Sequence, residues 1–112
     1  HSLLALLEIS QKNEIPIEVI VKKTSHAVAD RYGIKDRGYI REGYWADLVL
    51  VDPNSKFKVT KDNIMYECGW SPFEGHSFES KIEMTFVNGI KVYEQGRILT
   101  EPQGKRLEFH PN

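Results

Sequence analysis

The strongest constraint in the sequence is the dipeptide Asn88-Gly89, which lies between two largely apolar runs, residues 81–87 and residues 90–94. Both residue types tolerate the positive φ angles of a type I′ turn. The twist of this turn matches that of a β-hairpin closed by two residues. The sequence therefore predicts an antiparallel hairpin over residues 81–94.

The turn also predicts which residues of the hairpin face one another. Counting outward, the expected pairs are Val87 with Ile90, Phe86 with Lys91, Thr85 with Val92 and Met84 with Tyr93. One face then carries Ile82, Met84, Phe86 and Tyr93, and the other carries Val87, Ile90 and Val92. A hairpin that is apolar on both faces is expected to lie between two layers, one of them from another part of the protein.

Other extended segments surround the hairpin in the sequence. Residues 48–51 are apolar without alternation, which is typical of a strand covered on both faces. Further strands are expected at residues 57–60, at residues 97–100 after a turn at Gly96, and at residues 105–109 as a terminal edge strand. Residues 61–80 hold Gly69, Pro72 and Gly75 and are predicted to form a long ordered loop.

The first third of the chain is predicted to be helical. A first helix carries Leu3, Leu6, Leu7 and Ser10 at helical spacing, but Leu4, Ala5 and Ile9 extend its apolar surface most of the way round. Such a helix needs cover on more than one side. Residues 17–24 predict an amphipathic helix, and residues 27–32 a short one with Ser25 as its N-cap and Gly33 as its left-handed end. Gly38 and Gly43 flank a short strand or turn.

Composition excludes several classes of protein. The 112 residues include 15 Lys and Arg against 16 Asp and Glu, a formal charge of −1, so the basic excess of a nucleic-acid-binding domain is absent. No apolar run approaches the roughly 20 residues that cross a bilayer. The single cysteine, Cys68, cannot form an internal disulfide, which favours a reducing, cytoplasmic compartment.

The histidines do not form a recognisable metal motif. His1, His26, His76 and His110 are all far apart in the sequence. His26 and Asp30 are spaced i, i+4 on a predicted helix, but without a third ligand nearby a surface or capping contact is expected there. His110 is expected to be disordered or to face solvent.

The remaining reactive residues also favour structural roles. Cys68 has no cationic neighbour in sequence, so a packed thiol is expected. Asp47 is expected to cap the turn after Gly43, and Asp52 to form an Asx-turn with Pro53-Asn54. Gly38 and Gly43 lack the strand-before, helix-after context of a phosphate loop. The sequence thus predicts no catalytic, cofactor-binding or metal-ligating residue.

Three segments in fixed order resemble the amidohydrolase superfamily. Residues 36–52 are similar to its segment G-x-I-x-x-G-x-x-A-D-L-V-L-x-D, which follows the catalytic barrel, and residues 85–96 to its closing hairpin. Residues 21–33 resemble its last helices, where Asn-Pro-Ala more commonly stands at residues 26–29. The loop Cys68-Gly69-Trp70-Ser71-Pro72-Phe73-Glu74-Gly75 and the opening residues 1–7 look most like the long, barrel-type dihydroorotases.

The loop itself is expected to be mainly structural. Trp70 and Phe73 would be hydrophobic plugs, Pro72 and Gly75 would shape the turn, and Glu74 would satisfy backbone donors.

The resemblance implies a composite α+β fold. Residues 1–33 would be the terminal helices of a missing TIM-type barrel, and residues 34–112 the C-terminal portion of a small β-sandwich. Because the chain begins with His1 rather than Met, without the pattern of a signal peptide, it is interpreted as a C-terminal fragment. The intact enzyme would reversibly hydrolyse dihydroorotate to N-carbamoyl-aspartate in pyrimidine biosynthesis.

The resemblance also locates the chemistry outside this chain. In such enzymes two zinc ions activate the attacking hydroxide and an Asp shuttles the proton. Their ligands are a His-x-His pair, a carboxylated Lys, two further His and an Asp, and all would precede His1. The chain alone is thus expected to bind no zinc and to be inactive.

The expected partners follow from this interpretation. They are the rest of the same chain, a small-molecule substrate, a second copy in a homo-oligomer and an association with aspartate transcarbamoylase, with no nucleic acid or membrane. The alternatives are part of a hydantoinase, dihydropyrimidinase or allantoinase, or of a non-catalytic dihydroorotase-like subunit that scaffolds aspartate transcarbamoylase.

Overall fold

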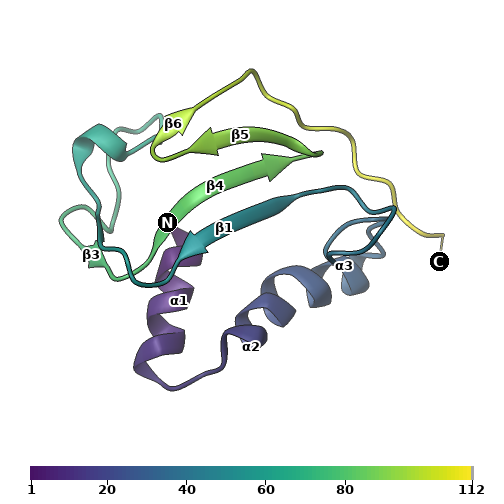
Figure 1. Cartoon of the computed structure of the whole chain (residues 1–112), viewed down its shortest axis with the longest axis horizontal. Helices are drawn as coiled ribbons and strands as arrows, with labels where there is room; N and C mark the ends of the chain where they lie inside the picture. Colours follow the sequence, from purple (N-terminus) through teal and green to yellow (C-terminus); the bar gives the residue numbers. More distant parts are fainter. Residues whose placement is uncertain (112) are drawn as a thin grey trace.

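The computed structural model describes residues 1–111 and has an α+β architecture (Figure 1). The helical elements are α1 (Ser2–Lys12), α2 (Ile17–Val21), the π-helix η1 (Lys22–His26), α3 (Ala27–Tyr32) and the 3-10 helix η2 (Lys61–Asn63). The strands are β1 (Leu48–Asp52), β2 (Phe57–Lys58), β3 (Ser77–Phe78), β4 (Lys81–Val87), β5 (Ile90–Glu94) and β6 (Arg97–Ile98).

The predicted hairpin is confirmed as the centre of a four-stranded antiparallel sheet with strand order β1-β4-β5-β6. Asn88 and Gly89 have φ angles of 53° and 81°, as a type I′ turn requires. Gly96 also makes the expected turn, into β6.

The predicted register of the hairpin is wrong beyond its second pair. Val87 faces Ile90 and Phe86 faces Lys91, but Thr85 faces Tyr93 and Met84 faces Glu94. A β-bulge inserts Val92 as an extra residue, which moves Tyr93 to the Thr85 face. Both faces of the hairpin are apolar, so this change of register does not move a buried apolar face into water. The alternation of apolar and polar residues therefore could not reveal it.

One face of the four-stranded sheet is buried only at one end, where β1 finishes and β4 starts. Val51 and Ile82 pack on a core made by Leu4 and Leu7 of α1 together with Val59 and Phe78. At this end α1 lies against the sheet (Figure 1). The predicted strand at residues 48–51 is confirmed, but the expectation that both its faces are covered is wrong within this chain: Val49 and Leu50 remain 45% exposed.

Residues 61–80 are not one loop. Thr60 and Asn63 form a reciprocal capping box around η2, and the next residues turn back into β3, which pairs with β2. The Val59 N–H also donates to the His76 carbonyl at 2.9 Å. β2 confirms the start of the strand predicted at residues 57–60, whereas β3 was missed because it has only two residues, too few for a periodic pattern.

The second and third predicted helices are one continuous helical segment, which we call the helical arm (residues 17–32). Ser25 is not an N-cap; it lies within η1, where the Ala27 N–H donates to the Lys22 carbonyl five residues earlier. The backbone stays helical at Val21, His26 and Ala27, so no N-terminus forms there. Gly33 does end the arm in the left-handed conformation, with φ of 64°.

The C-terminal residues do not form the predicted edge strand. Phe109 makes an isolated bridge with Ile34, the Lys35 N–H donates to the Glu108 carbonyl at 2.8 Å, and the His110 N–H donates to the Gly33 carbonyl at 2.7 Å. The tail therefore leaves β6 and runs to the end of the helical arm (Figure 1). Between residues 1 and 111, no helix is long and apolar enough to cross a membrane.

Candidate functional site

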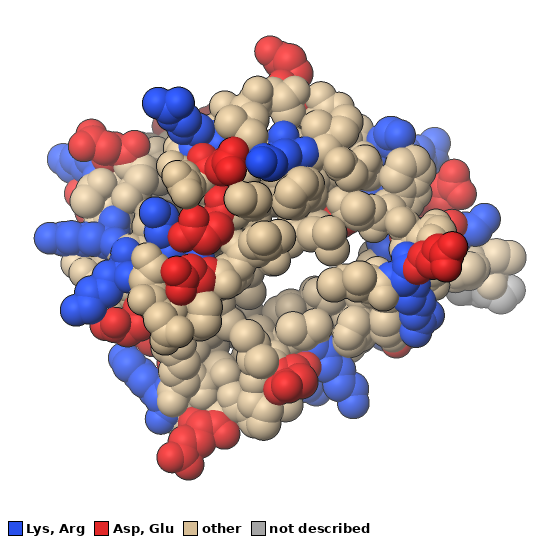
Figure 2. All heavy atoms as spheres, in the orientation of Figure 1, with Lys and Arg blue, Asp and Glu red and all other residues tan. Residues whose placement is uncertain are grey.

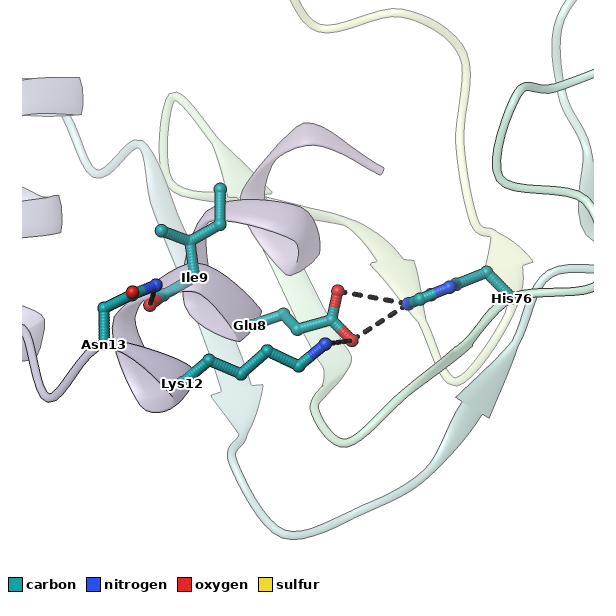
Figure 3. Close-up of polar contacts among 5 residues, drawn as sticks. All are labelled: Glu8, Ile9, Lys12, Asn13 and His76. Atoms are coloured by element: carbon teal, nitrogen blue, oxygen red, sulfur yellow. Dashed lines mark hydrogen bonds and ion pairs between the residues drawn. The ribbon is translucent and has the colours of Figure 1, made fainter.

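An ion-pair cluster joins α1 to the segment before β3. Glu8 accepts from His76 Nε2 at 2.9 and 3.1 Å, and Lys12 Nζ lies 3.6 Å from the same carboxylate (Figure 3). The hydrogen bond from His76 is the main cause that lowers the pKa of Glu8 below its ordinary value. This contact links residues 68 positions apart, so no local pattern could have predicted it.

A second junction holds the helical arm against the turn at Gly38. His26 Nδ1 lies 2.7 Å from the Gly38 carbonyl oxygen, and its ring stacks on Tyr39 with centroids 4.1 Å apart. The Tyr39 hydroxyl donates to Asp30 at 2.7 Å, and this bond raises the pKa of Tyr39. His26 and Asp30 therefore both make structural contacts, but with Gly38 and Tyr39; the expected contact between the two residues themselves is not formed.

A third junction ties the loop after the arm to the hairpin. One oxygen of Asp47 pairs with Arg37, and the other accepts the backbone N–H of Asn88 at 2.8 Å. The expectation that Asp47 caps the turn after Gly43 is wrong, because its carboxylate is engaged by these two donors. The predicted Asx-turn of Asp52 is confirmed by the Asn54 N–H at 2.9 Å.

The loop that carries the dihydroorotase resemblance is less packed than expected. Cys68 is exposed and Trp70 is 60% exposed, so the packed thiol and the tryptophan plug are both wrong. Phe73 does pack on the core. Glu74 was expected to accept from backbone donors of the loop, but it lies exposed. The Ser71 hydroxyl oxygen instead accepts from the Phe73 N–H.

These junctions do not amount to a metal centre. Within residues 1–111, no group of three His, Cys, Asp or Glu side chains is placed to hold a metal ion. The four histidines are apart, and the His110 side chain faces solvent as expected. The described residues therefore do not fit the zinc pair that the resemblance implies, and no reaction step can be derived from them.

The chain exposes far more surface than a self-contained protein of its size. Its accessible area is 8439 Å², whereas a 12.9 kDa monomer is expected to expose about 6,300 Å². Its radius of gyration is 15.3 Å against an expected value of about 13 Å. Figure 2 shows why: an opening passes through the molecule between the sheet and the helical arm.

Apolar side chains contribute much of this excess. The helical arm exposes Ile17, Val21, Val28 and Tyr32 by 40–68%, and Ile40 is 87% exposed. A hollow of about 740 Å³ runs along the arm; Ile17, Val21 and Ala27 line it together with His26, Tyr39 and the charged residues Glu18, Lys22 and Asp30. The surplus of about 2,100 Å² exceeds the roughly 800 Å² that each partner buries in an ordinary specific interface.

Comparisons with known proteins identify relatives over most of the chain. No family model matches it. It is 33% identical over 97 residues to an allantoinase of Desulfitobacterium hafniense, covering 87% of the chain and 22% of that protein. It is 31% identical over 102 residues to a dihydroorotase of Pyrococcus furiosus, covering 91% and 24%.

A solved structure matches as well. The L-hydantoinase (dihydropyrimidinase) of Arthrobacter aurescens superposes with a TM-score of 0.74 at 27% identity, over 81% of this chain and 20% of that one. The chain thus spans about a fifth to a quarter of the length of the relatives it matches.

Proposed function

Because the chain is related to the cyclic amidohydrolases, we propose that it is the C-terminal part of one, and that the intact protein is a dihydroorotase. Residues 1–33 would belong to the end of its barrel and residues 34–112 to its β-sandwich. The chain itself would be structural, and the residues that act on substrate would lie elsewhere in the protein. We also propose a cytoplasmic location.

The single observation that carries this proposal is the surplus of exposed surface. The chain exposes about 2,100 Å² more than expected, with apolar side chains exposed on both the helical arm and the sheet, and such a surface needs a second body to cover it. The three polar junctions support the same interpretation, because they hold α1, the helical arm and the sheet in a fixed relation without forming a reactive centre.

The choice of dihydroorotase rests on the loop from Cys68 to Gly75. The relatives named allantoinase and dihydroorotase are equally distant, so an allantoinase or a hydantoinase is the second candidate, and a non-catalytic scaffold for aspartate transcarbamoylase the third. A homo-oligomer remains part of the proposal.

Substrate profiling of the intact protein tests the activity. We expect ring opening of dihydroorotate, with allantoin, hydantoin and dihydrouracil opened much more slowly. Preferential opening of allantoin or hydantoin would overturn the dihydroorotase assignment, but the intact protein would still be a cyclic amidohydrolase. No turnover of any of them, with metal ligands missing upstream, would favour the scaffold.

A split-protein experiment tests the structural role separately. The 112-residue chain is co-expressed with the portion that precedes it, and each half is also made alone. We expect a soluble, active complex only when both are present. Full activity in the preceding portion alone would contradict the proposed covering role.

A further inference from the structure

A second hollow, of about 420 Å³, lies where the end of α3 meets the loop after it and the C-terminal tail; we call it the tail hollow. Its polar lining includes Arg37, Arg41, Tyr39, Tyr44 and Asp30. Gly33, Ile34 and His110 also line it, and the His110 N–H donates to the Gly33 carbonyl. The third junction engages Arg37 through Asp47, but none of the three junctions involves Arg41.

The Arg37 side chain is largely buried and has a single carboxylate partner. The side chain is 10% exposed, one nitrogen pairs with Asp47, and its Cζ lies 5.3 Å from the Trp45 ring centroid. A guanidinium carries five N–H donors. Among residues 1–111 that bond to Asp47 is the only one that the guanidinium makes. Its other N–H donors keep some access to solvent, because Asn88 Oδ1 is the only fully buried polar side-chain atom without a partner in the described chain. These donors are therefore available to a ligand.

Arg41 is held by aromatic rings and not by a carboxylate. Its Cζ lies 4.1 Å from the Tyr39 ring centroid and 5.6 Å from that of Tyr44, and Nη1 makes only a long contact of 3.5 Å to the Tyr44 hydroxyl. No carboxylate of the described chain lies within 4.0 Å of it. Stacking of this kind fixes the plane of the guanidinium and leaves its edge for a ligand.

The charges of the tail hollow are therefore unevenly placed. Asp47 offsets Arg37, while one Asp30 oxygen already accepts from the Tyr39 hydroxyl at 2.7 Å. The unpaired positive charge and the unpaired donors lie at Arg41, Tyr44 and Arg37. Planar donor pairs of this type match the two oxygens of a carboxylate or phosphate.

We propose that the tail hollow binds a small oxyanion, a carboxylate or phosphate group, held by the guanidinium groups of Arg41 and Arg37 with the Tyr44 hydroxyl as a further donor. The proposal does not depend on the proposed enzyme activity, since it concerns neither barrel nor catalytic metal. Inorganic phosphate and malonate serve as probes that distinguish the two sources of the anion.

The test is calorimetric titration of both probes into the intact protein at low ionic strength. We expect saturable binding of at least one probe, weakened about tenfold or more by Arg41→Gln, the loss typical of a charged hydrogen bond. Arg41→Lys should lose part of that affinity, because lysine keeps the positive charge but lacks the planar pair of N–H donors of the guanidinium. Arg97→Gln, which removes the same charge at the far edge of the sheet, is the control.

A second measurement does not depend on the variants folding. In the wild-type protein with ¹⁵N-labelled arginine, the probe that binds should shift the side-chain signals of Arg37 and Arg41 and leave Arg97 unchanged. No saturable binding of either probe, equal weakening by the Arg41 and Arg97 variants, or unchanged Arg37 and Arg41 signals would each overturn the proposal.

Discussion

Replacing Gly38 by alanine should destabilise the protein more than any other glycine substitution in the loop after the helical arm. Gly38 has a φ of 85° and lies directly against α3. A Cβ at this position would overlap the Cβ of Ala29 and lie 3.0 Å from the Ser25 carbonyl oxygen. The substitution therefore combines backbone strain with a clash against a helix.

The two contributions can be estimated and separated. A positive φ costs a non-glycine residue about 1–2 kcal/mol, and overpacking a close contact costs about 1–3 kcal/mol more. Gly38→Ala should thus lower the free energy of unfolding by about 2–5 kcal/mol. Gly43→Ala is the matched control, because Gly43 has a similar φ of 82° and no atom within 4 Å of its Cβ position. It should lose only about 1–2 kcal/mol.

Urea unfolding followed by circular dichroism measures both variants. All proteins are compared at one concentration, because self-association makes the midpoint concentration-dependent. Ala29→Gly, which removes the clashing methyl group, should cost about 1 kcal/mol alone as a helix substitution. In the double variant it should recover part of the Gly38→Ala loss, with a coupling energy of about 1 kcal/mol or more.

Two results would refute this reasoning. Equal losses in Gly38→Ala and Gly43→Ala would mean that only backbone strain acts and that the helix does not press on Gly38. Strict additivity of Gly38→Ala and Ala29→Gly would mean that the two positions are not in contact.

Three other perturbations follow from the structure. Because the pKa of Glu8 is lowered in the folded protein, its contribution to stability is present above its unfolded pKa of about 4.5 and is lost as pH falls through the folded pKa. In Glu8→Gln the urea midpoint of unfolding should therefore depend less on pH over that acid range. An unchanged dependence of the midpoint on pH would contradict the contact with His76. Asp47→Ala leaves the nearly buried Arg37 without its partner and should lower the free energy of unfolding in urea by about 2 kcal/mol. The control Asp52→Ala, which removes an exposed Asx-turn, should lower it by less than about 1 kcal/mol. Equal losses would argue against the junction at Asp47. The 112-residue chain alone should self-associate in sedimentation velocity, and a stable monomer would count against the need for a covering body.

The parts of the fold that could be predicted from sequence are those with short-range causes. Asn88-Gly89 determines a hairpin because its turn needs two positive φ angles in succession. Gly33 ends the arm because the left-handed helix end needs one positive φ angle, which glycine adopts without strain. The bulge at Val92 had no such signal. Its extra residue is permitted because each face of the hairpin is apolar, so the pattern is compatible with either register.

The contacts of the candidate site were harder to predict for two reasons. Glu8 and His76 meet across 68 positions, and only the docking of α1 brings them together. Cys68 and Trp70 were expected to be packed because their residue types usually are, yet both are exposed in this structure. Asp47 was recognised in the motif, but its two partners depend on where the hairpin turn lies.

The connection between β1 and β4 has a consequence for the order of folding. Asp52 ends β1 and Lys81 begins β4, so the β1–β4 pairing encloses a 28-residue excursion, whereas β4 and β5 are joined by two residues. On loop-closure entropy alone the longer connection costs about 2 kcal/mol more. The hairpin is thus suited to act as the nucleus, with β1 adding afterwards. Substitutions at the Asn88-Gly89 turn should chiefly slow folding, while those in β1 should chiefly speed unfolding.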